Sequence, residues 1–231
     1  MRREALACDV CPVRNRAACA ALDPDERREL ARLGHHRTLN RGETLFAAGD
    51  DNSVCATLIT GALKVSSFDE QGTEHIVSLI HPAGFAGELF APATHHDVIA
   101  LTDSELCMFP RGEYERALRQ FPDLGAALLQ RSSQDLLESR SLLALTNGRT
   151  ATQRVAGFLL TLARAATDME CHSAREFDLV LSRGEIASLL GTTIETVSRQ
   201  FTRLERDRLI RRQGTRGIQL LDPARLGKLA S

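Results

Sequence analysis

The chain has 231 residues, of which 43% are hydrophobic, and its formal net charge at pH 7 is -1. It is long enough to bury one large core or two small ones without help from disulfides or metals. The sequence has no apolar run of the roughly eighteen residues that a membrane span needs. Its start, "MRREALACDV", lacks the apolar stretch of a secretory signal. We therefore expect a cytoplasmic protein with no membrane partner.

Three of the six cysteines lie close together, in "CDVCPVRNRAAC" at positions 8 to 19. In a reducing compartment, clustered cysteines more often hold a metal or do redox chemistry than form structural disulfides. Taken alone, the C-x2-C pair with a third cysteine is also compatible with zinc. Cys55 lies in an apolar strand pattern and is expected to be a buried small hydrophobe. Cys171, in the polar stretch "DMECHSAREF", is expected to be a spare thiol.

Residues 26–112 show the pattern of a small β domain. Glycines divide this region at short intervals, and runs such as "ATLITGALKVSSF" and "EHIVSLI" lie between them. Short strands separated by frequent turn signals are typical of an antiparallel sandwich or barrel. Within this region the paired His95 and His96 are better explained by a polar surface loop than by a haem or zinc site.

Residues 113–148 are predicted to form one long helix that leaves the β domain. Apolar residues recur there at helical spacing, and Gly148 follows as a stop. An apolar stripe that outruns a small domain usually packs on a second copy of itself, which predicts a homodimer. The alternative is a helix that lies across its own domain. The next stretch, "TATQRVAGFLLTLARAA", predicts an amphipathic helix that opens the last domain, residues 149–231.

The last domain carries the positive charge. Residues 149–231 hold 14 Lys or Arg against 9 Asp or Glu, whereas residues 1–148 hold 15 against 21. Such an asymmetry indicates a surface that binds a polyanion. Ser182 with Glu185, and Thr192 with Glu195, each have the spacing of a capping box, and Gly191 lies between them. Two short helices joined by such a turn predict a helix-turn-helix that binds double-stranded DNA.

The second of these helices carries the residues expected to read DNA. Glu195, Ser198 and Arg199 lie at i, i+3 and i+4 and therefore share one face. Arginine can bind guanine through O6 and N7, and glutamate can accept a hydrogen bond from cytosine N4. Thr193 and Arg203 complete the expected DNA-binding set. The following "LIRRQGTRGIQLL" predicts a hairpin wing whose arginines are available for phosphates.

These motifs together resemble the CRP/FNR superfamily of bacterial transcription regulators over nearly the whole chain. "RGETLFAAGD" at 41–50 and "GEL" at 87–89 resemble its cyclic-nucleotide-binding-type β-roll, and "ETVSR" at 195–199 resembles the E-x-x-S-R motif of the FNR branch. The resemblance implies an α+β fold with an N-terminal antiparallel β-roll, a long dimerisation helix and a C-terminal winged helix-turn-helix. It also implies palindromic DNA sites of the TTGAT type and contact with RNA polymerase.

The effector expected from the resemblance is not a cyclic nucleotide. Members that bind one have an arginine about ten residues after the G-E-L motif, where it holds the phosphate. Here the position ten after Glu88 is Val98, and no arginine occurs between Arg41 and Arg111. A buried phosphate would therefore lack its charged, bidentate partner.

The FNR branch instead senses oxygen through a [4Fe-4S] cluster held by three N-terminal cysteines and a fourth near the end of the β-roll. By this resemblance Cys8, Cys11 and Cys19, in a segment of residues 1–25, and Cys107 in "SELCMFP" are the ligands. Seven residues separate the second and third cysteines, where the best-known members have five. Two alternatives stay open: a regulator of the same fold that uses zinc or thiol redox, and an electron-transfer enzyme. The enzyme is disfavoured because the chain lacks nucleotide-binding and zinc-protease motifs.

Overall fold

The computed structural model describes residues 8–147, 150–165 and 174–230, so Cys171 lies outside the described residues. The chain divides into two compact units, Met1–Ser139 and Arg140–Ser231. Within the described ranges, no helix is both long and apolar enough to cross a membrane.

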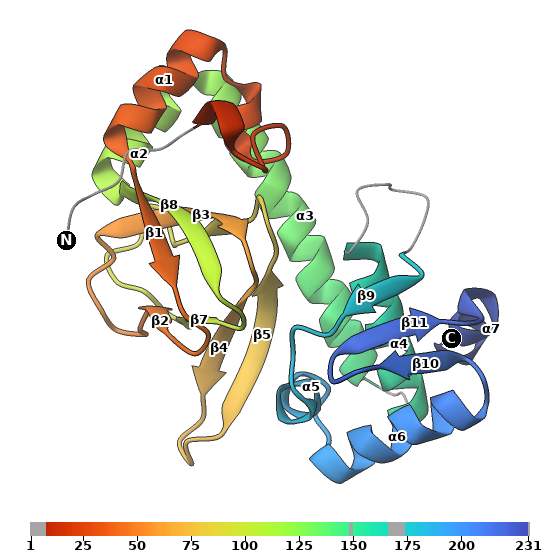
Figure 1. Ribbon diagram of the computed structural model, residues 1–231. Helices are drawn as coiled ribbons and strands as arrows, with labels where there is room; N and C mark the ends of the chain where they lie inside the picture. Colours follow the sequence, from red (N-terminus) through yellow and green to blue (C-terminus); the bar gives the residue numbers. More distant parts are fainter. Residues whose placement is uncertain (1–7, 148–149, 166–173, 231) are drawn as a thin grey trace. The chain divides into compact units, whose positions relative to one another are not determined.

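The first unit is built on two four-stranded antiparallel sheets (Figure 1), which confirms the predicted β-roll. One sheet has the order β1-β8-β3-β6, with strands His35–Leu39, Ser104–Pro110, Val54–Thr60 and Phe85–Ala86. The other has the order β2-β7-β4-β5, with strands Thr44–Phe46, Asp97–Ala100, Leu63–Phe68 and Glu74–Ile80. Buried side chains from both sheets meet in one apolar core.

Strand β8 shows how the alternation of a strand separates two cores. Leu106 and Met108 point into the core between the sheets, whereas Cys107 and Phe109 point to the opposite face. That outer face is covered by helix α1 (Pro24–Leu33), helix α2 (Arg111–Gln120) and the N-terminal segment, which Figure 1 shows gathered beside β8 and β3. The sulfur of Cys107 therefore faces the segment that carries the other three cysteines.

The predicted long helix is confirmed, but its predicted start at residue 113 is wrong, because the structure has two helices over residues 113–148. Helix α2 ends at Gln120, and helix α3 runs from Pro122 to Thr146. Between them Phe121 has φ -117° and ψ 89°, which is not helical. Proline lacks an N–H and crowds the residue before it, so Pro122 forces this break and then begins the next helix.

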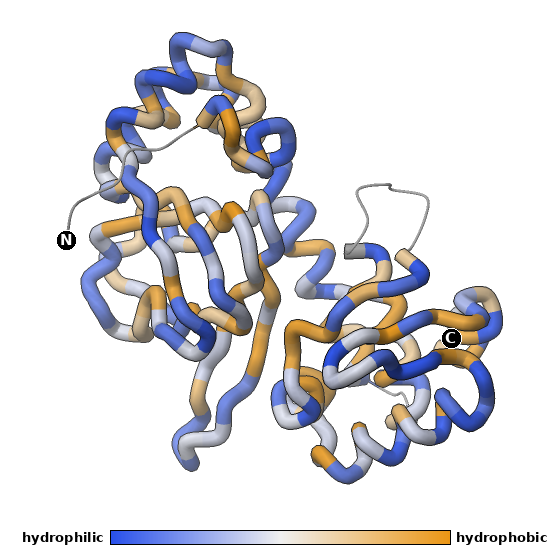
Figure 2. The backbone as a smooth tube through the Cα atoms, in the orientation of Figure 1, coloured by the Kyte–Doolittle hydropathy of each residue, from blue (hydrophilic) through white to orange (hydrophobic). Residues whose placement is uncertain are grey.

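The second unit contains the end of α3 and the predicted winged helix-turn-helix. Helix α4 (Ala151–Ala165) confirms the amphipathic helix expected at its start. The remaining elements are β9 (Glu176–Asp178), α5 (Arg183–Leu189), α6 (Ile194–Arg206), β10 (Ile210–Gln213), β11 (Gly217–Leu220) and α7 (Pro223–Ala230). Strands β10 and β11 form the expected hairpin, and β9 pairs with β11. Figure 2 shows hydrophobic and hydrophilic residues mixed along α6, as an amphipathic helix requires.

The caps of α5 and α6 confirm one predicted box and correct the other. Ser182 and Glu185 form the predicted capping box of α5. The second box, between Thr192 and Glu195, is wrong, because the N-cap of α6 is Thr193, whose side chain accepts from the Thr196 N–H. Gly191 has φ +58°, and the Thr192 N–H donates to the Ala187 carbonyl at 2.9 Å. Thr192 is thus still closing the end of α5, and the cap falls on the next residue.

Candidate cysteine site and DNA-reading surface

The N-terminal segment is held against the β-roll by small apolar side chains between the second and third cysteines. It contains two short 3-10 turns, Cys8–Val10 and Ala18–Ala21, which carry Cys8 and Cys19. Between these turns Val13 and Ala17 are only 1% and 2% exposed and pack with residues of the β-roll. The seven residues that separate Cys11 from Cys19 therefore contain the segment's anchor.

The four cysteines predicted as ligands line one cavity. Three come from the N-terminal segment, and Cys107 comes from β8. The remaining lining residues are Val13, Arg14, Ala17, Arg27, Leu30, Ala31, Thr57, Phe109 and Tyr114. Apart from the cysteines, this cavity is mostly apolar and is bordered by two arginines.

Burial sets the acidity of these thiols. Burial first, and then the neighbouring thiols of Cys8 and Cys11, raise the pKa of Cys19 to about 11. Burial first, and then the neighbouring thiols of Cys11, Cys8 and Cys19, raise the pKa of Cys107 above that of Cys19. Burial also raises the pKa of Cys8, with Cys11 as the next cause. The thiols of Cys8, Cys19 and Cys107 are therefore protonated at neutral pH in the metal-free chain, and metal binding would release these protons.

The donor set of the cavity suits a sulfur-ligated group. The lining contains four thiols, and thiols are the donors that iron–sulfur clusters use. The Nε–H of Arg14 is buried and has no hydrogen-bond partner among the described residues. An orphaned buried donor is costly, and a sulfur atom of a bound group would satisfy it. Within the described residues, no three His, Cys, Asp or Glu side chains are arranged to hold a single metal ion.

Cys55 is not part of this cavity, as the sequence predicted. It lies on β3 and is 0% exposed in the apolar core beneath α2, beside Tyr114. Burial raises its pKa to about 12, with the Glu115 carboxylate as the next cause. It behaves as a small buried hydrophobe.

A second cavity, of about 370 Å³, lies in the β-roll next to the G-E-L motif. Its lining includes Val98, where cyclic-nucleotide binders have arginine, and Glu88. None of the described residues that line it is Lys or Arg. The cavity therefore offers no guanidinium or ammonium group to a phosphate.

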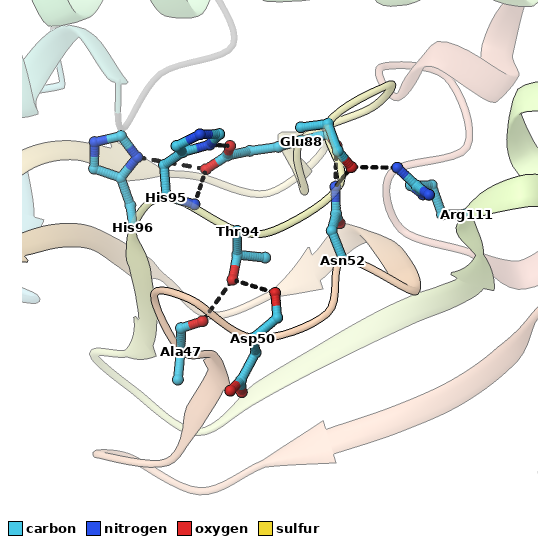
Figure 3. A network of polar contacts seen from close by, with 9 residues as sticks. Ala47, Asp50, Asn52, Glu88, Thr94, His95, His96 and Arg111 are labelled. Carbon is cyan, nitrogen blue, oxygen red and sulfur yellow. Dashed lines mark hydrogen bonds and ion pairs between the residues drawn. The ribbon is translucent and has the colours of Figure 1, made fainter.

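The loop beside this cavity is fixed by a polar network (Figure 3). The buried Asn52 amide donates to the carbonyls of Glu88 and Ala91, and the Arg111 guanidinium also donates to Ala91. The Glu88 carboxylate accepts from the His95 backbone N–H at 2.9 Å and contacts the ring nitrogens of His95 and His96. These contacts lower the pKa of Glu88 against the opposing effect of burial. The two histidines thus belong to a polar loop that Glu88 ties down.

Helix α6 presents one buried and one exposed face. Val197, Phe201 and Leu204 are each 0% exposed and pack in the core of the unit. The predicted DNA-binding residues lie on the exposed side, at Thr193, Glu195, Ser198, Arg199 and Arg203. The structure thus leaves the predicted reading face accessible, while Thr193 also caps the helix.

Three contacts that the sequence did not predict position this helix. The Arg199 guanidinium donates to Thr196 Oγ1 at 3.3 Å. The Thr152 hydroxyl of α4 donates to the Gln200 amide oxygen at 2.7 Å, within the buried interface of the two helices. The same hydroxyl accepts from Arg203 at 3.3 Å. Thr152 is separated from Gln200 and Arg203 by about fifty residues in the chain, so no local sequence signal identifies these two contacts.

The wing arginines differ in their surroundings. Arg212 forms an ion pair with Glu205 of α6, with 2.7 Å between Nε and Oε2. Arg211 and Arg216 are exposed on the hairpin. Of the three wing arginines, Arg211 and Arg216 are therefore the ones that we most readily expect to contact DNA phosphates.

Comparison with known proteins places the chain in a family. Residues 36–121 match the cyclic nucleotide-binding domain, and residues 153–229 match the Crp-like helix-turn-helix domain. The chain is 35% identical over 222 residues to the transcriptional activator protein FnrL of Cereibacter sphaeroides, covering 95% of this chain and 90% of that protein. The chain belongs to the CRP/FNR superfamily. It is therefore a transcription regulator with a DNA-binding helix-turn-helix and not an enzyme.

Other CRP/FNR relatives extend the comparison. The transcriptional activator protein Anr of Pseudomonas protegens is 33% identical over 210 residues, covering 90% of this chain and 84% of that protein. The nitrogen fixation regulation protein FixK of Bradyrhizobium diazoefficiens is 31% identical over 224 residues, covering 97% and 94%. The solved structure of FixK2 from Bradyrhizobium japonicum shares the fold, with a TM-score of 0.77 at 24% identity over 86% of this chain and 98% of that one.

Proposed function

We propose that this chain is a homodimeric, oxygen-responsive transcription regulator whose Cys8, Cys11, Cys19 and Cys107 hold a [4Fe-4S] cluster. The observation that carries the proposal is the single cavity that these four thiols line. Soft thiolate ligands suit iron, and a cubane takes one thiolate at each of its four corners. A bound cluster would supply an oxygen-labile group here.

The residues of the chain connect this site to the start of α3. Cys19 and Cys107 pack against an apolar cluster that also contains Phe121, Leu124 and Leu128. Phe121 lies just before α3, and both leucines lie in its first two turns. Release of the N-terminal segment would therefore remove packing from the beginning of the dimerisation helix. Contiguous packing of this kind is a physical route for coupling two sites.

The exposed face of α3 supports homodimer formation. Leu129, Leu136 and Leu143 are 70%, 50% and 59% exposed and lie seven residues apart. Leucines at heptad spacing pack on a second helix in coiled coils. Two copies joined in this way would present two α6 helices to the two halves of a palindrome.

We propose that Glu195, Ser198 and Arg199 read half-sites of the TTGAT type, with Thr193 and Arg203 as further contacts. The supporting observations are their exposure on α6 and the hydrogen bond that orients Arg199. We further propose that no cyclic nucleotide acts as effector, because neither Lys nor Arg is among the described residues of the β-roll cavity. Contact with RNA polymerase follows from the resemblance alone.

The cluster assignment is tested by purification without air, followed by an absorption spectrum and by iron and sulfide analysis. We expect a brown protein with about four iron and four sulfide per chain. Cys107→Ser should lower both contents sharply, whereas Cys55→Ala is the matched control because Cys55 is buried outside the cavity. A colourless protein that contains zinc or no metal after anaerobic reconstitution would sink the cluster assignment and leave the DNA-binding assignment standing.

A further inference from the structure

Two arginines line the cysteine cavity, and each binds the backbone of a different cysteine-bearing turn. Arg27 lies in the second turn of α1, from which side chains point back toward the helix start. Its Nε donates to the Cys19 carbonyl at 3.1 Å, and its Nη2 donates to the Leu22 carbonyl at 2.9 Å. The guanidinium therefore ties the turn of the third cysteine to α1.

Arg14 makes the equivalent contact with the first cysteine turn. Its Nη1 donates to the carbonyl of Asp9, at 2.8 Å, and Asp9 lies between Cys8 and Cys11. Its Nε–H is buried without a hydrogen-bond partner among the described residues. The side chain thus holds the turn with one nitrogen and leaves an unused donor in the cavity wall.

We propose that Arg14 and Arg27 are positioning residues that hold the turns of Cys8, Cys11 and Cys19 in place and balance the negative charge of the bound cluster. The inference rests on the proposed function. Four thiolates carry more negative charge than the iron–sulfur core carries positive charge, so the occupied site is anionic. An anionic group in a mostly apolar cavity needs cations or hydrogen-bond donors around it, and two guanidinium groups supply both.

The first test compares the Arg14→Gln and Arg27→Gln variants with the wild-type protein. Each protein is loaded with the [4Fe-4S] cluster in the absence of air and is then exposed to an iron chelator. The decay of visible absorption gives the rate of cluster loss. We expect each variant to lose the cluster on the order of 10-fold faster, as supporting residues of metal sites commonly do. Arg28→Gln is the matched control, because Arg28 lies next to Arg27 but bonds to Pro24 and Asp25 of its own helix. It should release the cluster at the wild-type rate.

A second readout needs no cluster. In metal-free protein, alkylation of each cysteine is followed by mass spectrometry of its peptide. Arg14→Gln should speed the labelling of Cys8 and Cys11, and Arg27→Gln should speed that of Cys19, since each arginine holds its own turn. The Arg14→Lys and Arg27→Lys variants keep the positive charge but lose the planar guanidinium group with its several N–H donors. They should therefore release the cluster at rates between those of the wild type and the glutamine variants.

The possible results separate this inference from the proposed function. A wild-type protein that binds the cluster, with glutamine variants that release it at the wild-type rate, overturns the inference and leaves the proposed function intact. A wild-type protein that takes up no iron and sulfide overturns both. If thermal melting shows that a glutamine variant is unfolded, the lysine variant decides, and release at the wild-type rate would again overturn the inference.

Discussion

Leu129→Ala should weaken the dimer without destabilising the isolated chain. The side chain is 70% exposed, so it contributes little to the fold of one chain. Covering that much leucine surface is worth about 1–2 kcal/mol per chain. A symmetric dimer loses the contact twice, about 2–4 kcal/mol, which corresponds to a roughly 30-fold to 1000-fold weaker dissociation constant.

The assay for this prediction is sedimentation over a dilution series under nitrogen, with the thermal melt of each sample recorded alongside. Leu137→Ala is the matched control, because Leu137 is 61% exposed but lies outside the seven-residue series. We expect Leu129→Ala to shift the dimer to monomer and Leu137→Ala to leave it intact. Equal dissociation constants for the two variants would refute the assignment of this face as the dimer contact.

Three further predictions concern the DNA-binding unit and the buried thiols. Arg199→Ala should weaken binding to a palindromic TTGAT-type site by about 1–3 kcal/mol per half-site in fluorescence anisotropy, while non-specific binding stays close to that of the wild type; equal losses on both DNAs would contradict base reading. Ser182→Ala removes the α5 cap and should cost about 1 kcal/mol, or about 4–8 °C in Tm; an unchanged Tm would contradict the role of the box. Burial raises the pKa of Cys19 to about 11 and that of Cys55 to about 12, above the usual value of 9.0, so the metal-free fold favours the protonated thiols. This contribution to stability is fully present below pH 9 and is lost as pH rises through the raised pKa values. Urea titrations at pH 8 and pH 10 should therefore show lower stability at pH 10, and Cys55→Ala should reduce the difference.

Patterns of residues close together in the sequence predicted the helices and strands of the fold well. The two wrong predictions, the unbroken long helix and the cap of α6, also have causes that lie nearby in the sequence. The capping box at Ser182 and the wing hairpin were predictable, because each depends on residues a few positions apart. The break at Phe121 was missed, although Pro122 signals it, because the apolar spacing runs through the break. The shift of the α6 cap to Thr193 depends on how α5 ends, since Thr192 is occupied in closing that helix.

The candidate site was only partly predictable. The resemblance to the FNR branch brought Cys107 together with the N-terminal cysteines, and strand alternation explains why Cys107 faces them while Met108 does not. Arg14 and Arg27 carry no sequence signal of this role, because their bonds go to backbone carbonyls that any residue could offer. Contacts of this kind depend on the tertiary path of the chain.

The most direct test of the central claim follows oligomeric state and DNA affinity in one loaded sample before and after exposure to air. Sedimentation and anisotropy with a palindromic TTGAT-type site are measured under nitrogen and repeated once the visible absorption has decayed. The account predicts a DNA-bound dimer under nitrogen, and loss of both the dimer and the binding in air. Loss of the cluster with unchanged oligomeric state and unchanged affinity would contradict it.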